Sequence, residues 1–427
     1  MTFRRPLAAL LLLGCSALSA QEERPSCGPW RFAGLELSGL KRAKPEVVSR
    51  EWTVARGEAF GCDELERFRM ALEGLDLFAS AEVSADGSGT VSVVVEELPP
   101  YLPIPSAKIS DQDGWLVGPA LIALDLFGRD VRLEAHYRTT VHPEFLRSQE
   151  FLLFESSPWI GPWKIEHELQ MIRVDSWNPL KKYDERSWEL DAVFARELLP
   201  GWSLLLWGEG FQVEANDSAL FGKEGGHDRH GILGAGFLAK RMDRELDPRN
   251  GWRLEGRWGW AGEPFGNVGS WQELTGDLRL WRRPFRKGPV LHALALARWR
   301  PGDVPFHQLY HQGGANSLRG YGADPDRRSR DELLSTFELR QPILERRPFT
   351  ALGCSFFVAL EGVAGVDAAR RGFDADAPGL IGFYGGLHLL LPGLDRVRFE
   401  GAWSRPEGFS FTIGLYEKAI AQRWRSR

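Results

Sequence analysis

The sequence predicts a mostly β protein, a transmembrane antiparallel β-barrel preceded by one small βααββ domain. Three observations support this fold class. Strand patterns fill the chain after residue 114, an export signal opens it, and 17 of its 427 residues are tryptophan. Tryptophan suits positions where an apolar phase meets water. The mean hydropathy of −0.28 agrees with a barrel, because strands that alternate apolar and polar residues average to a neutral value.

Residues 1–20 have the pattern of a signal peptide. A basic pair at positions 4–5 precedes an apolar run over 7–13 and small residues over 16–20. Cys15 ends a Leu-Leu-Gly-Cys sequence that resembles a lipoprotein processing box, so its lipidation is the alternative to cleavage after residue 20. Beyond this segment no run approaches the roughly 20 apolar residues of a membrane-spanning helix. We therefore expect an exported chain without helical spans.

Residues 30–98 predict a compact domain in which strands and helices are mixed. The expected elements are a strand over 32–40, a helix opened by Pro45, a second helix over 64–72, and a hairpin formed by 79–84 and 90–96. Cys27 and Cys62 lie at this domain and are the candidate disulfide, since an oxidising compartment permits one. No Cys/His spacing suggests a metal site, and we expect no cofactor.

Residues 99–113 predict a stiff, proline-rich linker, and residues 114–417 predict the barrel. Apolar and charged residues alternate along its strands, as in Val131 to Arg138. Many of these runs have about 10–14 residues, longer than the roughly 5–6 of ordinary strands and suited to crossing a bilayer. We count about 15 strand patterns and expect sixteen strands, because single-chain bacterial barrels have even numbers.

The last strand pattern is aromatic on one face. Its four apolar residues alternate with small and polar ones, and they are Phe409, Phe411, Ile413 and Leu415. Such a face suits a lipid-facing strand at the seam where a barrel closes. A basic tail follows at 418–427, which either binds lipid headgroups or frays.

The break between the strand patterns at 290–299 and 333–343 carries an arginine between glycines and an aromatic residue. Its motif residues are Gly313, Gly314, Arg319, Gly320 and Tyr321. A loop of this length in a compact domain is usually functional or disordered. The glycines allow positive φ angles and close backbone approach, and arginine offers five donors in a rigid fork. We expect a loop folded into the barrel lumen; the alternative is a solvated charge in a glycine-rich turn.

Together these features resemble the BamA/TamA superfamily of outer-membrane insertases and translocators, a bacterial surface-antigen type that includes two-partner secretion transporters. Residues 30–98 resemble a single polypeptide-transport-associated (POTRA) domain, and 313–321 resemble the family's Arg-Gly-aromatic loop motif. Residues 243–252 resemble its turn between middle strands. The family pairs the arginine with an aspartate in a Phe-x-Asp-x-Gly setting. Here the matching region, 357–362, holds Glu361, which becomes the expected partner.

The resemblance implies insertion of outer-membrane proteins or translocation of polypeptides, without ATP, in the outer membrane of a Gram-negative-type bacterium. The POTRA would lie in the periplasm, and strands 114–124 and 408–416 would meet at a weak seam. Implied partners are outer-membrane lipids, unfolded polypeptide clients, and periplasmic or lipoprotein subunits. The POTRA either captures clients by strand addition or only shields the barrel mouth. The alternative function is a passive channel.

Two further classes of function find no support in the sequence. A net charge of −5 gives no footprint for nucleic acid. His136, His167 and His292 lie in strand patterns without a Ser/His/Asp set around them, so we expect isolated luminal histidines and no enzyme.

Overall fold

The computed structural model describes residues 29–416 except for several short segments. These are 111–113, 142–147, 161–164, 179–182, 216–226, 245–246, 268, 286–287, 306–307, 315–316, 323–326, 352, 373–378 and 393. The predicted signal peptide (1–20), Cys15, Cys27 and the basic tail (418–427) lie outside the described residues. No helix in the described part of the chain is long and apolar enough to cross a membrane.

The N-terminal domain contains its strands and helices in the predicted βααββ order, with one additional short strand pair. The elements are β1 (Trp30–Arg31), β2 (Gly34–Ser38), α1 (Pro45–Ser49), β3 (Ala59–Phe60), α2 (Cys62–Gly74), β4 (Phe78–Ala85) and β5 (Thr90–Glu97). Its sheet has the order β2-β5-β4, with β2 parallel to β5. Helix α2 buries Leu65, Phe68 and Leu72, which lie on one helical face. Cys62, at the start of α2, is disulfide-bonded.

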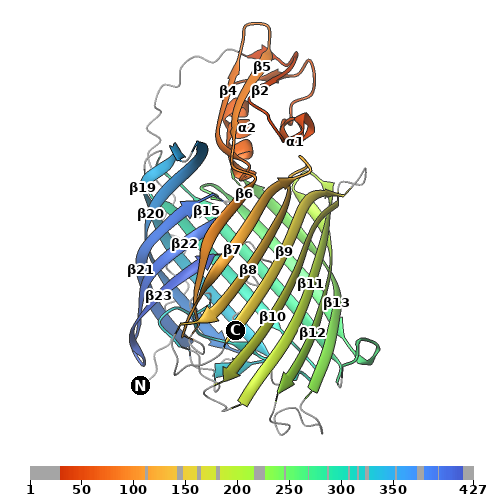
Figure 1. The fold of residues 1–427 in the computed structure, drawn as a ribbon, viewed down its shortest axis with the longest axis vertical. Coiled ribbons are helices and arrows are strands. Elements are labelled where there is room, and N and C mark those ends of the chain that lie inside the picture. Colours follow the sequence, from red (N-terminus) through yellow and green to blue (C-terminus); the bar gives the residue numbers. More distant parts are fainter. Residues whose placement is uncertain are drawn as a thin grey trace, which may run out of the picture.

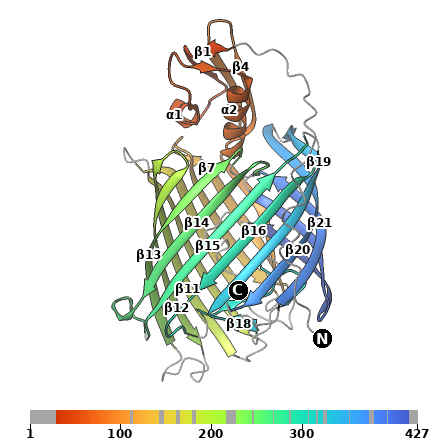
Figure 2. The ribbon, with the colours of Figure 1, turned by 180° about the vertical axis from the view of Figure 1, so that it is seen from behind.

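The rest of the chain forms one antiparallel sheet of sixteen strands, which confirms the predicted number (Figures 1 and 2). Its strands are β6 (Tyr101–Ser110), β7 (Gly114–Leu126), β8 (Val131–Thr140), β9 (Gln149–Ile160), β10 (Ile165–Asn178), β11 (Tyr183–Leu199), β12 (Trp202–Ala215), β13 (His227–Met242), β14 (Gly251–Ala261), β15 (Trp271–Arg282), β16 (Val290–Trp299), β19 (Asp331–Ala351), β20 (Cys354–Arg371), β21 (Gly379–Leu391), β22 (Leu394–Ser404) and β23 (Gly408–Tyr416). Each strand except the first and last pairs with its neighbours in the chain order of the barrel. Short helix η3 (Glu263–Phe265) and strands β17 (Tyr310–His311) and β18 (Arg328–Ser329) lie in connections.

The first barrel strand is β6, so the predicted linker at 99–113 and the barrel start at 114 are wrong. Tyr101 to Ser110 pair with β7 along their whole length. The proline content that predicted a linker comes from Pro103 and Pro105, which cannot donate to a ladder. Proline is tolerated on edge strands, and β6 is such an edge. Among the described strands no ladder joins β6 to β23, although the two lie side by side. This unladdered pair is the seam.

The N-terminal domain sits on one end of the barrel, which we call the module-side opening (Figure 1). The Arg346 guanidinium of β19 donates to the carbonyl oxygens of Glu73 (2.7 Å) and Phe78 (2.6 Å). Asp76, at the end of α2, accepts a 3.0 Å bond from Arg132 of β8, and both side chains are buried. Barrel residues also join the apolar core of the domain, among them Leu102, Ile122 and Phe357. The domain and the barrel therefore share one core.

Candidate functional site

The loop between β16 and β19 begins at the end of the barrel opposite the N-terminal domain and folds against the luminal wall. The predicted motif glycines adopt the conformations that require glycine: φ is 146° at Gly313, 89° at Gly314 and 86° at Gly320. A Cβ on Gly320 would lie 2.9 Å from the carbonyl carbon of Trp403. The loop backbone is thus pressed against β22, which a larger residue would prevent.

Arg319 is buried and is held by Asp367 of β20. Its Nε and Nη2 donate to the two carboxylate oxygens at 2.7 and 2.9 Å, and its own backbone N–H donates to Asp367 at 3.1 Å. Thr336 of β19 donates to the same carboxylate at 2.7 Å. The guanidinium also stacks on the Tyr384 ring, 3.2 Å from its centroid. We call the Arg319–Asp367 pair the luminal latch.

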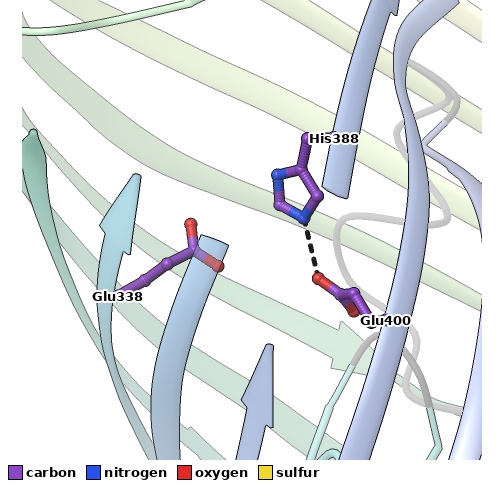
Figure 3. Close-up of side chains that lie close together, drawn as sticks. All are labelled: Glu338, His388 and Glu400. Carbon is purple, nitrogen blue, oxygen red and sulfur yellow. Dashed lines mark hydrogen bonds and ion pairs between the residues drawn. The ribbon is translucent and has the colours of Figure 1, made fainter. Parts of the chain in front are cut away.

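Two further carboxylates flank the guanidinium. Nη1 of Arg319 lies 3.2 Å from Glu400 of β22 and 3.4 Å from Glu338 of β19. Figure 3 shows that these two carboxylates approach each other together with His388, whose Nε2 is 2.8 Å from Glu400. Tyr384 completes the group by donating to Glu338 at 2.7 Å. One loop residue thereby contacts side chains on β19, β20, β21 and β22.

Glu338, His388 and Glu400 also have the composition of a metal site, since one ligand atom from each lies within 4.8 Å of the others. Arg319 Nη1, however, lies within 3.4 Å of both carboxylates and occupies the position that a cation between them would take. Arg340 adds a second guanidinium at Glu338. The cluster is accordingly filled by the cation of the loop itself.

Neighbouring residues fix the loop on either side of Arg319. Leu318 is fully buried against apolar residues of the wall, including Leu334 and Ala369. The Tyr321 hydroxyl donates to the carbonyl oxygen of Ile381 at 3.2 Å. A Cβ on Gly382 of β21 would lie only 1.9 Å from the carbonyl oxygen of Arg319. The wall is therefore shaped to receive the loop backbone.

Glu361 is not the partner of Arg319, which corrects the assignment made from the motif spacing. Its carboxylate lies 3.3 Å from Arg396 of β22, near the module-side opening. Glu361 and Asp367 are six residues apart on β20 and so face the same side of the strand. The loop enters from the opposite end, where β20 terminates at Arg371, and reaches Asp367 first. How far the loop enters the barrel therefore decides which carboxylate pairs with Arg319. The spacing of residues in the sequence does not show this depth.

The predicted lipid-facing strand is β23. Phe409 and Phe411 are 73% and 55% exposed and face outward, whereas Ile413 is half-buried. The backbone of Leu415 pairs with Val397. The seam strand thus presents aromatic side chains on the outer wall of the barrel.

A cavity of about 710 Å³ runs through the lumen from the N-terminal domain to the luminal latch. Leu75 and Leu77 of the domain line one end, and Arg319 and His388 line the other. Cationic side chains outnumber acidic ones on its wall. Both charged and apolar side chains line this cavity, and the domain contributes to its wall at the module-side opening.

A buried Ser-His-Glu chain, which the sequence reasoning did not find, lies on β6 and β8. Ser106 Oγ is 3.2 Å from His136 Nδ1, and His136 Nε2 is 3.1 Å from Glu134. We missed it because Ser106 fell in the predicted linker. Its hydroxyl accepts a 2.6 Å bond from Arg138, the serine is 1% exposed, and it does not line the cavity. Within the part of the chain that the structure describes, this hydroxyl is closed to solvent.

Comparison with known proteins places the chain by its fold. No family model and no curated protein sequence matches it. Among solved structures, CdiB from Escherichia coli is similar with a TM-score of 0.56 and 12% identity, over 94% of this chain and 92% of that one. CdiB from Acinetobacter baumannii gives 0.55 and 10%, over 91% and 74%. BamA from Haemophilus ducreyi lacking POTRA domains 1–3 gives 0.50 and 12%, over 90% and 83%.

The architecture therefore defines a class: a sixteen-stranded barrel with a short N-terminal domain and a loop folded into the lumen. Within that class the chain has the fold of BamA and CdiB. The resemblance predicted from the motif residues is confirmed at the level of the fold.

Proposed function

We propose that this protein inserts outer-membrane proteins or translocates polypeptides across the outer membrane, without ATP. The observation that carries the proposal is the combination of a seam without a ladder and a buried latch on the wall beside it. A passive pore needs neither. The fold shared with BamA and CdiB supports the same reading, and with it an outer-membrane location with the N-terminal domain in the periplasm.

The seam supplies the means of acting on a polypeptide. Unpaired edges of β6 and β23 would accept a client strand by backbone hydrogen bonding once they separate. Pro103 and Pro105 deprive β6 of two donors, which limits how firmly the barrel can close there. The contacts of Arg319 hold strands β19, β20, β21 and β22 together, and these strands form the wall next to β23 while the seam opens. Arg319 is therefore a positioning residue in this scheme.

The remaining partners follow from exposed surfaces. Aromatic side chains on the outer wall, such as Trp258 and Phe411, would contact lipid. Among the described residues the outer strands of the N-terminal sheet, β2 and β4, form no further ladder, and such sheet edges suit extended clients or periplasmic and lipoprotein subunits. We propose no enzymatic activity and no nucleic-acid partner.

The second candidate is a passive channel, which the luminal cavity of about 710 Å³ favours. Depleting the protein and comparing outer-membrane proteomes separates the two. Loss of a set of barrels or exported chains supports insertion or translocation. An unchanged proteome, together with steady conductance of the purified protein in planar bilayers, would establish the channel.

Replacing Arg319 by alanine tests the latch within this function. Breaking a buried charge pair costs about 3–5 kcal/mol, so we expect a lower temperature of heat-modifiability and weaker client assembly. The variant is compared with wild type in the depletion strain. Unchanged folding and client assembly would remove the latch from the mechanism.

A further inference from the structure

The turn between β13 and β14, described over residues 243–244 and 247–250, lies at the module-side opening. Asp243 shapes it: its carboxylate accepts bonds from the Arg249 backbone N–H (2.9 Å) and the Asn250 side chain (3.2 Å). A turn ordered by its own side chains presents its remaining residues in fixed directions. Among these, Asp247 points away from the turn's own strands.

Asp247 contacts the far wall of the barrel. Its carboxylate accepts a 2.8 Å bond from Arg396 of β22. In the sheet, β21, β20, β19, β16 and β15 all lie between β22 and β14. The contact therefore spans the lumen and does not join neighbours that a ladder already holds. Arg249 extends the same bridge to Glu345 of β19 at 2.5 Å.

The far end of this bridge lies on β22, one strand from the seam. Arg396 is in register with Tyr416, the last residue of β23. Arg396 and Glu400 occupy alternating positions on the same face of β22, and Glu400 contacts Arg319 at 3.2 Å. Strand β22 therefore has two contacts inside the barrel. Arg319 of the luminal loop contacts it toward one end of the barrel, and Asp247 of the turn contacts it toward the other.

The bridge is charged and only slightly exposed. The side chains of Asp247 and Arg396 are 13% and 11% exposed, which limits screening by solvent. Burial alone would raise the pKa of Asp247, but the guanidinium groups of Arg396, Arg249 and Arg244 together hold it below its ordinary value. The carboxylate is therefore ionised at neutral pH.

The turn also contacts the N-terminal domain. Arg244 lies 3.8 Å from Glu73 near the end of α2. One short segment thereby touches the domain, the opposite wall and the strand beside the seam.

We propose that Asp247 and Arg396 form a second latch, the mouth latch, which holds β22 from the module side and keeps the seam closed. The inference rests on the proposed function in one respect: it assumes that β6 and β23 separate during activity. In this proposal Asp247 keeps the module-side end of the seam closed, and the luminal latch keeps the opposite end closed.

Hydrogen exchange of the full-length protein in lipid nanodiscs, followed by mass spectrometry, tests the mouth latch. The variants are Asp247→Asn, Arg396→Gln and the double variant. We expect each single change to speed amide exchange in 101–110 and 394–416 about tenfold, since a tenfold change corresponds to about 1.4 kcal/mol. The double variant should exchange no faster than Arg396→Gln, because that change already removes the contact with Asp247 together with the 3.3 Å contact between Arg396 and Glu361.

Asp175→Asn is the matched control. Asp175 pairs with Arg173 and Arg186 at 3.0 and 2.9 Å, on strands β10 and β11 that a ladder already joins. Amide hydrogen exchange of the Asp175→Asn variant in 101–110 and 394–416 should equal that of wild type. Should Arg396→Gln fail to give a heat-modifiable barrel, Asp247→Asn carries the test, because its site lies in a turn and its shape is conserved.

Two outcomes would overturn the mouth latch: seam exchange equal to wild type in Asp247→Asn, or fully additive effects in the double variant. The test is separate from that of the proposed function. Faster seam exchange without any client defect on depletion would refute insertion but keep the latch. A client defect with unchanged seam exchange in Asp247→Asn would refute the latch alone.

Discussion

Arg319 keeps its charge in a buried position because carboxylates surround it on several strands. Asp367 contributes most of the contact, with two side-chain bonds and one backbone bond. We expect Asp367→Asn to release the loop, since the change leaves the guanidinium without its bidentate partner. Limited proteolysis of the 300–330 loop measures the release. Glu361→Gln is the control on the same strand and should leave cleavage of the loop at the wild-type rate; a faster rate would restore Glu361 as partner.

Gly382 allows a second test of the same docking, this time by sterics. A Cβ there would lie 1.9 Å from the carbonyl oxygen of Arg319, so Gly382→Ala should displace the loop although no charge is altered. Gly379→Ala serves as control because no heavy atom lies within 4 Å of its Cβ position on the same strand. The proteolysis assay compares the two variants. Equal protection of the loop from proteolysis in Gly382→Ala and Gly379→Ala would show that the wall accommodates the added methyl group without displacing the loop.

The residue identities in this site were predictable to different degrees. The glycine positions and Arg319 follow from local chemistry, since positive φ and a buried fork of donors require those residue types. Asp367 does not, because β20 carries two carboxylates on one face, Glu361 and Asp367, and the sequence does not show which of them the loop reaches. Glu338 and Glu400 join the site only through the fold, which brings β19 and β22 against one loop. Composition of the wall was predictable, whereas the depth of the loop was not.

At the scale of elements, the N-terminal domain depends on a clamp at the end of β5. Glu97 is 9% exposed and accepts backbone bonds from Lys41 (2.7 Å), Arg42 (2.9 Å) and Ala43 (3.0 Å). Burial would raise the pKa of Glu97, but these bonds and the Arg42 side chain lower it below its ordinary value of 4.5. The stabilisation is therefore complete above pH 4.5 and is lost as the pH falls through the lower folded pKa.

We accordingly expect Glu97→Gln to destabilise the domain at pH 7 and to weaken its response to acid. Hydrogen exchange over residues 30–97, corrected for the intrinsic effect of pH, measures both quantities between pH 7 and pH 3. Glu36→Gln on β2 controls for removal of one charge from the same sheet. An identical pH response in Glu97→Gln and wild type would contradict the clamp.

Elements were easier to foresee inside the barrel than at its edge. Alternation of apolar and charged residues identifies strands that are paired on both sides. β6 lacks that signal because positions 103 and 105 are proline. A strand tolerates these two prolines only where it lies at the edge of a sheet, as β6 does. The two prolines therefore make β6 hard to predict as a strand, and they also indicate that it is an edge strand at the seam.

For the whole molecule, the decisive contact is the one between the N-terminal domain and the barrel. The predicted linker at 99–113, although stiff, would have separated the domain from the first barrel strand by fifteen residues, whereas β6 follows β5 with only three residues between them. Because β6 belongs to the seam, the domain is tied to it directly. Movement of the domain and opening of the seam should consequently be linked.

Arg346 is the residue through which this linkage can be tested. It donates to two backbone carbonyl oxygens of the domain and lies over the Phe357 ring, 3.6 Å from its centroid. Each hydrogen bond from a charged group contributes about 1.5–3 kcal/mol, so Arg346→Ala should raise the undocked population at least tenfold. Conductance across the cavity should rise with it, because the domain covers the module-side opening. Arg347→Ala, at an exposed neighbouring position, controls for the loss of one arginine. If both variants conduct like wild type, the domain is not what closes the lumen, and the loop and the turn at 243–250 must close it alone.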